Sequence, residues 1–194
     1  MKDGRILFIY KRFIGETHHD EAPSCLAARY SSDNGETWTD DRILATREQH
    51  QAVNLGSVSL MRMANGDIGW FYNIRYGWHD VRLHLRRSSD EGESWSEPIC
   101  CISETGYFVV NNDRVVRLST GRLLIPACKM KFAAGRRRSS GTVHFYFSDD
   151  DGRTWKEANN DCSLPVPRSE RGLLEPGVVE LSNGVVWAWS RTDK

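Results

Sequence analysis

The sequence predicts an all-β protein, a β-propeller of four-stranded antiparallel blades. An eight-residue pattern, Ser-x-Asp-x-Gly-x-(Thr/Ser)-Trp, occurs three times, at residues 31–38, 88–95 and 148–155. Its tryptophans, Trp38, Trp95 and Trp155, are separated by 57 and 60 residues, which is the length of one blade. A second pattern, a turn ending in glycine and followed by an apolar run, alternates with the first. No stretch of the 194 residues has a helical hydrophobic period.

Each repeat is predicted to contain four strands, named A to D in chain order. Strand A is an apolar run before a turn, at residues 57–61, 115–118 and 178–181. Strand B follows the turn glycines, which are Gly4, Gly66, Gly121 and Gly184. Strand C ends at the eight-residue box and covers residues 26–30, 81–85 and 143–147. Strand D follows the box.

The box itself is predicted to form a hairpin turn between strands C and D. An Asp side chain accepts hydrogen bonds from backbone amides that follow it, and glycine adopts the positive φ that tight turns need. The tryptophan after the turn is predicted to fill the space between neighbouring blades. A calcium loop is the alternative for residues 149–154, but Arg153 stands where such a loop needs a ligand.

The composition of the chain limits which partners and cofactors are expected. The chain carries 26 basic and 26 acidic residues, so its net charge of zero gives no reason to expect nucleic acid or an anionic membrane as a partner. No apolar run approaches the length of a membrane span. The five cysteines lack metal-binding spacing, and no metal or other cofactor is expected. Unpaired cysteines and the absence of a signal peptide favour a cytoplasmic location, with secretion left open if the N-terminus is truncated.

The predicted topology gathers one set of side chains at the end of the blades opposite the boxes. Nine residues before each turn glycine stand Ser57, Asn112 and Glu175. The basic residues just past the B strands are Arg12, Arg75, Lys129, Lys131 and Arg191, and the loops there add Arg114 and Arg136–Arg138. Arginine holds carboxylates and phosphates by paired hydrogen bonds, so this end is predicted to form an anion-recognising pocket. A solvated basic rim is the alternative.

The boxes resemble the Asp-box, or BNR, repeats of the sialidase (neuraminidase) superfamily. Leu174-Glu175-Pro176 and Ser190-Arg191 resemble the sialidase segment that holds the active-site glutamate and, sixteen residues later, the second arginine of the carboxylate-binding triad. Tyr10-Lys11-Arg12 resembles the segment that ends an early strand with a pocket arginine, and residues 106–114 resemble a segment of bacterial BNR-type proteins. The family fold is a six-bladed propeller.

This resemblance implies exo-hydrolysis of a terminal α-linked sialic acid, or a related acidic sugar, from glycoconjugates. Glu175 is then the base that activates a tyrosine nucleophile. Asp20 is the general acid, with Glu16 and Glu21 as alternatives. The implied substrate-binding residues are Arg12, Arg191, Arg114, Arg75 and Asn112. The family's first and third triad arginines and its tyrosine have no match here, and Tyr107 is the nearest candidate nucleophile.

Counting strands gives about three and a half blades, so residues 1–194 are expected to form a sialidase-like propeller domain that is incomplete at both ends. Open blade edges favour self-association. Two other functions stay open: a non-catalytic propeller that binds glycans or proteins through the same face, and a glycosidase of neutral sugars on the same fold.

Overall fold

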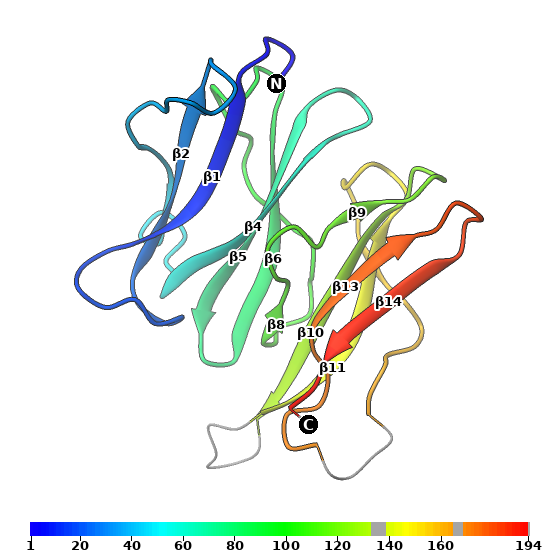
Figure 1. The fold of residues 1–194 in the computed structure, drawn as a ribbon. Helices are drawn as coiled ribbons and strands as arrows, with labels where there is room; N and C mark the ends of the chain where they lie inside the picture. The colour runs from blue at the N-terminus through cyan, green and yellow to red at the C-terminus, as the bar shows by residue number, and fades with distance from the viewer. Residues whose placement is uncertain (133–138, 165–168, 194) are drawn as a thin grey trace.

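The computed structural model describes residues 1–132, 139–164 and 169–193 (Figure 1). Arg136–Arg138, which were predicted to lie in a loop at the basic end of the blades, fall outside the described residues. The described chain forms four antiparallel sheets, and all five cysteines are free. None of the described segments is a helix long and apolar enough to cross a membrane.

The sheets follow one another along the chain as the repeats predict. The first has the order β1 (Ile6–Phe13), β2 (Ser24–Ser31), β3 (Arg42–Thr46). The second has the order β4 (Asn54–Arg62), β5 (Ile68–Gly77), β6 (Asp80–Ser88), β7 (Ile99–Cys100). The third contains β8 (Phe108–Val109), β9 (Val116–Arg117), β10 (Leu123–Phe132), β11 (Ser139–Ser148) and β12 (Lys156–Glu157). The fourth pairs β13 (Leu174–Glu180) with β14 (Val186–Arg191).

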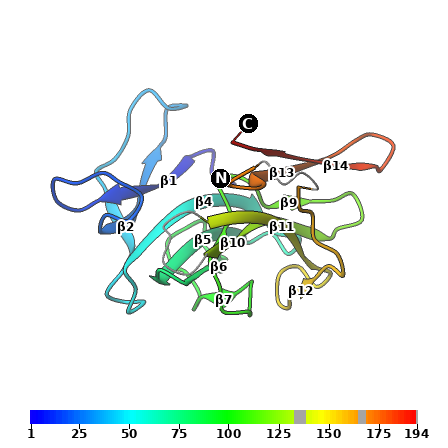
Figure 2. The same cartoon turned by 90° about the horizontal axis from the view of Figure 1, so that it is seen from below.

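The arrangement of the sheets in space is that of consecutive propeller blades. In Figure 2 the inner strands β4, β9 and β13 lie toward one concave side, and the short strands β7 and β12 lie on the outer side. The first three sheets contact one another through their faces and are stacked around the concave side. The predicted all-β propeller architecture is confirmed.

The inner edge of the third sheet consists of two short strands. The strand expected over residues 115–118 is present as β9, and a second short strand, β8, precedes it. β8 pairs with β10 near Cys128, and β9 pairs with the other end of β10 at Leu123 and Leu124. The segment between them, which carries Asn111–Arg114, lies outside the ladder with β10.

The three Asp boxes share one hydrogen-bond pattern. In the second box, Ser88 Oγ donates to Asp90 Oδ1 at 2.7 Å, and the backbone N–H of Gly92 donates to Ser88 Oγ at 2.7 Å. The N–H and the hydroxyl of Ser94 donate to the two Asp90 carboxylate oxygens at 2.9 and 2.5 Å. The same bonds recur in the other two boxes. The predicted hairpin turn is therefore confirmed in all three.

These bonds make the boxes sensitive to acid. Hydrogen bonds from the Thr37 and Ser94 hydroxyls and amides lower the pKa of Asp33 and Asp90 to about 2, from a usual value of 3.8. A carboxyl whose pKa is lower in the folded state stabilises the fold above the unfolded pKa, and this stabilisation disappears as pH falls toward 2. We expect the thermal midpoint of Asp90→Asn to lie below that of the wild type at pH 7. It should also fall less than the wild type's between pH 4 and pH 2.

Circular-dichroism melts across this pH range test the expectation, with Asp40→Asn controlling for the loss of one exposed carboxylate. Equal acid sensitivity of wild type and Asp90→Asn would show that the box does not contribute to it.

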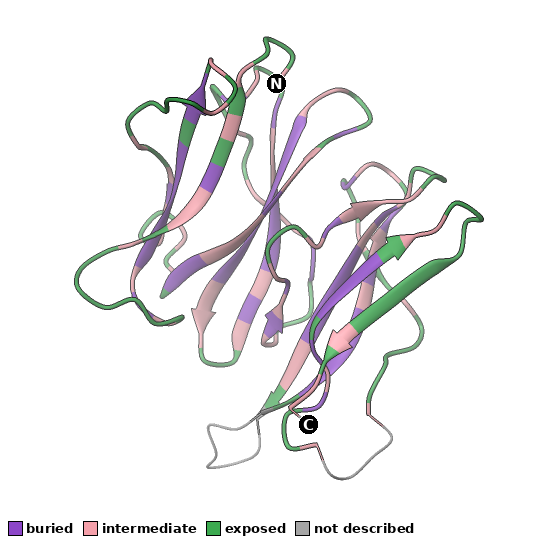
Figure 3. Cartoon of the chain, in the orientation of Figure 1, coloured by how far each residue is buried: buried purple, intermediate pink, exposed green. Residues whose placement is uncertain are grey.

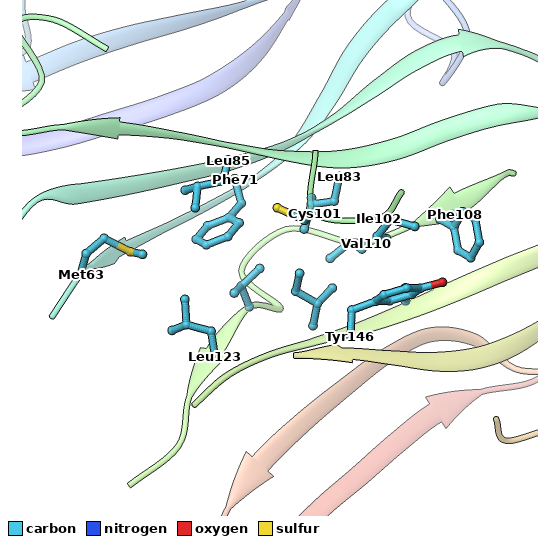
Figure 4. Packing of buried hydrophobic residues seen from close by; sticks show 13 residues of the cluster. Met63, Phe71, Leu83, Leu85, Cys101, Ile102, Phe108, Val110, Leu123 and Tyr146 are labelled. Atoms are coloured by element: carbon cyan, nitrogen blue, oxygen red, sulfur yellow. The ribbon is translucent and has the colours of Figure 1, made fainter. Parts of the chain in front are cut away.

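Two apolar clusters join the first three sheets. One lies between the first and second sheets and includes Leu26, Trp70 and Tyr72. The other lies between the second and third sheets (Figure 4), where Phe71 and Leu85 of the second sheet face Leu123 and Tyr146 of the third. Burial of the apolar surface in these two clusters is the main favourable contribution to the free energy of stacking the sheets.

The box tryptophans take part in this stacking with one exception. Trp95 packs edge-on against Trp70, with ring centroids 5.2 Å apart, and Trp155 packs against Phe71 at 6.1 Å. Both were predicted to fill the space between blades. Trp38 instead remains 39% exposed beside Phe8, because it lies on the face of the first sheet that no other described sheet covers. Self-association through such open sheets stays a prediction.

A further contact ties the second and third boxes to the sheets before them. The residue after the box aspartate accepts a hydrogen bond from the backbone of the preceding sheet's glycine turn. Glu91 accepts from the Lys2 N–H at 2.9 Å, and Asp151 accepts from the Ala64 N–H at 3.1 Å. An arginine of the box's own sheet, Arg62 or Arg117, pairs with the same carboxylate.

Candidate functional site

Two inner strands bend at the end of the sheets opposite the boxes. The pairing of β4 with β5 shifts register between Gly56 and Val58, and that of β13 with β14 shifts between Leu174 and Gly177. Ser57 and Glu175 lie in these irregularities with φ of 49° and 53°. A bulge of this kind changes the direction in which a side chain points and is common beside active sites.

Ser57 and Glu175 were predicted to occupy equivalent positions, nine residues before a turn glycine, and both adopt a positive φ there. In the third sheet the residue with this conformation is Asp113, with φ of 53°, one residue after the predicted Asn112. The break between β8 and β9 accounts for the offset.

Glu175 is held in an unfavourable backbone conformation. It precedes Pro176, and residues before proline prefer an extended backbone. A left-handed φ at a non-glycine residue costs about 1–3 kcal/mol. In this conformation its carboxylate meets the Arg191 guanidinium through two contacts of 2.8 Å, Oε1 to Nη2 and Oε2 to Nε. The strained backbone therefore serves to bring Glu175 and Arg191 together.

Charge at this pair keeps Glu175 ionised. The hydrogen bond from Arg191 is the largest cause of a lowered pKa for Glu175, partly opposed by burial and reinforced by Arg114 and Arg171. Both side chains stay about half exposed, so the pair is accessible to a ligand. Arg114 lies nearby with its guanidinium carbon 6.0 Å from the ring centre of Trp189.

A cavity of about 690 Å³ opens between the first two sheets and the segment before the third. This volume suits a small-molecule ligand. Of the predicted site residues, Asp20, Arg75 and Asn112 line it. Glu175, Arg191 and Arg114 form a second group on the third and fourth sheets, and the segment 111–114 contributes to both groups.

Lys11 and Asp20 lie together in the cavity. The ammonium of Lys11 donates to the main-chain oxygen of Asp20 at 3.2 Å, and the Asn54 amide donates to the same oxygen at 2.7 Å. The backbone of the loop that carries Asp20 is thus fixed from two strands. Its carboxylate stays exposed, which leaves it accessible to a substrate.

Arg75 and Tyr107 form the opposite part of the cavity. Arg75 Nη2 donates to the Tyr107 hydroxyl at 2.5 Å, and the guanidinium lies 4.9 Å from the centre of the tyrosine ring. Burial is the largest cause of a raised pKa for Tyr107, with Arg75 acting in the opposite direction. Tyr107 is therefore neutral near pH 7.

Asn112 has a structural contact in addition to its place in the cavity. Its Oδ1 accepts a hydrogen bond from the Val58 N–H at 2.8 Å, and the Asp113 N–H donates to the Val58 oxygen at 3.0 Å. These bonds join the bulge of β4 to the break between β8 and β9.

Arg12 does not join the other predicted residues. Its guanidinium pairs with Asp41 at 3.2 Å, on the face of β1 that also carries Tyr10. Its neighbour Lys11 lines the cavity instead, although no role was predicted for Lys11 from the sequence.

The guanidinium groups of Arg75, Arg114 and Arg191 are of a kind that can bind an anion. The carboxylates of Asp20 and Glu175 are of a kind that can exchange a proton with a ligand. Within the described part of the chain, no cluster of His, Cys, Asp and Glu has the arrangement of a metal site.

Comparison with known protein families and curated sequences gives consistent matches. A family model described as a BNR repeat-like domain matches residues 24–194. A sialidase of Bacteroides fragilis (strain YCH46) is 28% identical over 109 residues, which is 54% of this chain and 19% of that protein. A sialidase of Clostridium perfringens is 28% identical over 110 residues, 50% of this chain and 29% of that protein. The matched part thus spans less than a third of either curated relative.

Solved structures with the same fold include sialidases, which are β-propellers. A protein of unknown function from Dyadobacter fermentans DSM 18053 superposes with a TM-score of 0.75 at 22% identity, covering 98% of this chain and 59% of that one. The Hadza microbial sialidase Hz136 gives 0.72 at 19% identity, covering 99% and 40%. Trypanosoma rangeli sialidase with the inhibitor DANA gives 0.68 at 23% identity, covering 98% and 33%.

Proposed function

Because this chain belongs to the BNR repeat-like domain family, we propose that it is a sialidase-like glycoside hydrolase. Its reaction is exo-hydrolysis of a terminal α-linked sialic acid, or a related acidic sugar, from a glycoconjugate. The observation that carries the proposal is the Glu175–Arg191 pair, which a strained bulge holds at the end of an inner strand.

Glu175 is the base in this proposal. Sialidases use a tyrosine nucleophile in place of a second carboxylate, since the substrate's own carboxylate repels an anionic nucleophile. A neutral tyrosine then needs a nearby ionised group to accept its proton. The lowered pKa of Glu175 suits that role.

The other predicted residues act on the substrate. Asp20 protonates the leaving oxygen and later activates water. Arg191, assisted by Arg114, binds the carboxylate of the sugar through charge-assisted hydrogen bonds. Arg75 and Asn112 bind the rest of the sugar from the cavity wall. Arg12 stays a predicted substrate-binding residue, although it pairs with Asp41.

Hydrolysis of a fluorogenic aryl α-sialoside tests the proposal. Arg191→Met should lower kcat/KM by about tenfold to a hundredfold, because a hydrogen bond to a charged group contributes about 1.5–3 kcal/mol. The same substitution removes the main cause of the low pKa of Glu175. The acidic limb of the pH–rate profile should therefore move to higher pH.

Arg122→Met is the matched control. Arg122 pairs in the same two-contact manner with Asp149, at the opposite end of the third sheet, and its loss should leave kcat/KM unchanged. Equal cleavage of a neutral aryl glycoside, or a rate on the sialoside that is insensitive to Arg191→Met, would contradict the proposal.

A further inference from the structure

The face that the second sheet turns toward the first carries three aromatic side chains. Trp70 stacks on Tyr72 with ring centroids 4.5 Å apart and meets Trp95 edge-on at 5.2 Å. Trp70 and Tyr72 are completely buried in the cluster between the first and second sheets. This aromatic group therefore forms one side of a junction between neighbouring sheets.

The first sheet carries the same group on its uncovered face, here called the first-sheet face. Phe8 stacks on Tyr10 at 5.3 Å and meets Trp38 edge-on at 5.8 Å. Phe8 follows its turn glycine by four residues, as Trp70 does, so the two groups occupy equivalent places in their sheets. Phe8 is nevertheless 50% exposed. The first-sheet face thus has the form of one side of a junction, and no described sheet supplies the other side.

The fourth sheet leaves the opposite side of such a junction uncovered, here called the fourth-sheet face. Val179, Trp187 and Trp189 are 44%, 62% and 48% exposed. By their spacing from the turn glycine, Val179 and Trp189 correspond to Met61 and Phe71 of the second sheet. Met61 and Phe71 both pack in the cluster that joins the second sheet to the third. The fourth-sheet face is therefore the side that packs on the next sheet along the chain.

A polar contact of the internal junctions can also be completed between these two faces. In the second box Glu91, with φ of 57°, accepts a hydrogen bond from the N–H of Lys2, two residues before the preceding sheet's turn glycine. The first box has Asn34 at this position, with φ of 59°. Its amide oxygen can accept such a bond. The equivalent donor on the fourth sheet is the N–H of Ser182, two residues before its turn glycine.

The first-sheet and fourth-sheet faces are thus the two sides of one kind of junction. The first and fourth sheets lie at the two ends of the row of described sheets (Figure 1), so a single chain does not bring these faces together. A second copy of the chain presents both faces. Uncovered apolar patches of this kind commonly mark protein–protein contacts.

We propose that a second copy of this chain covers these faces, with the fourth-sheet face of one copy packed on the first-sheet face of the next. The contact is heterologous, so each copy can bind one neighbour at each end, and association continues unless the copies close into a ring. The fourth sheet contributes only two strands, so the contact is weaker than the internal junctions and depends on concentration. The inference does not rest on the proposed hydrolysis.

Sedimentation velocity between about 1 and 200 µM protein tests this contact. The wild type should form dimers and larger species as concentration rises. Phe8→Asp and Trp187→Asp each place a charge on one face, and each should weaken association by about tenfold or more. Both positions are half exposed or more within one chain, so both variants should keep the wild-type circular-dichroism spectrum. Trp78→Asp is the control, since Trp78 is 51% exposed in the connection between β5 and β6, away from both faces.

A mixture of the two variants tests the head-to-tail geometry. Phe8→Asp retains an intact fourth-sheet face and Trp187→Asp an intact first-sheet face. An equimolar mixture should therefore form dimers and nothing larger, although each variant alone stays monomeric. In the wild type, amide exchange in β14 should also become slower as concentration rises, whereas exchange in β5 should not change.

Three results would overturn the proposal. The first is a folded wild type that stays monomeric up to the highest concentration, which would assign the two faces to a different occupant. The second is association of Phe8→Asp or Trp187→Asp that equals that of Trp78→Asp. The third is a mixture that stays monomeric under conditions in which the wild type associates, which would exclude a contact between these two faces. Rates on an α-sialoside decide the proposed hydrolysis separately.

Discussion

Replacing Glu175 by glutamine is expected to lower kcat for α-sialoside hydrolysis by about a hundred- to ten-thousand-fold. The amide cannot accept a proton, so the nucleophile loses its base. It keeps a similar shape and still accepts one hydrogen bond from Arg191. The carboxylate is about half exposed, so the thermal midpoint should change little. Initial rates at saturating substrate, together with melts of the same samples, measure both quantities.

Glu180→Gln is the control for this substitution. It makes the same chemical change on the same strand, β13, but Glu180 accepts hydrogen bonds from Ser119 at the far end of that strand. Its kcat should match the wild type. An active Glu175→Gln protein would remove the role proposed for Glu175 as the base.

Replacing Phe71 by alanine is expected to destabilise the fold by about 3–5 kcal/mol. Phe71 is completely buried between the second and third sheets, where it meets Trp155 and several aliphatic side chains. Its removal opens a cavity that rigid strands on both sides cannot close. For a chain of this size the thermal midpoint should fall by roughly 6–20 °C.

Phe8→Ala is the matched comparison, since Phe8 is 50% exposed on the open face of the first sheet. Phe8→Ala should lower the free energy of unfolding by only about 0.5 kcal/mol, as is usual for surface positions. If Phe71→Ala does not fold, Phe71→Leu should still fold, with a smaller and measurable loss of unfolding free energy. Similar midpoints for Phe71→Ala and Phe8→Ala would contradict the packing of the second and third sheets against each other.

Local signals accounted for most of the fold. The Asp box specifies its own turn through Ser88, Asp90 and Gly92, whose bonds all lie within a few residues. The glycine turns likewise define where β4 ends and β5 begins. Elements governed by such short-range chemistry can be located from sequence alone, and the strands between them follow by alternation.

The candidate site was less predictable because it depends on register and on contacts between sheets. Arg12 and Lys11 are both basic and adjacent, and the packing of Ile9 against the second sheet decides which of them reaches the cavity. The bulge at Glu175 and the break around Asp113 each change which side chains point inward.

The contacts of the second and third boxes with the preceding glycine turns have a consequence for how the molecule opens. Through these contacts and the apolar clusters, neighbouring sheets among the first three stabilise one another, as in repeat proteins whose stability is a sum of nearest-neighbour terms. β14 is exposed along nearly its whole length (Figure 3), whereas the second sheet is covered on both faces. Local unfolding should therefore spread inward from the first and fourth sheets. The amide protons of β5 and β6 are then the last to exchange with solvent, and those of β14 are among the first.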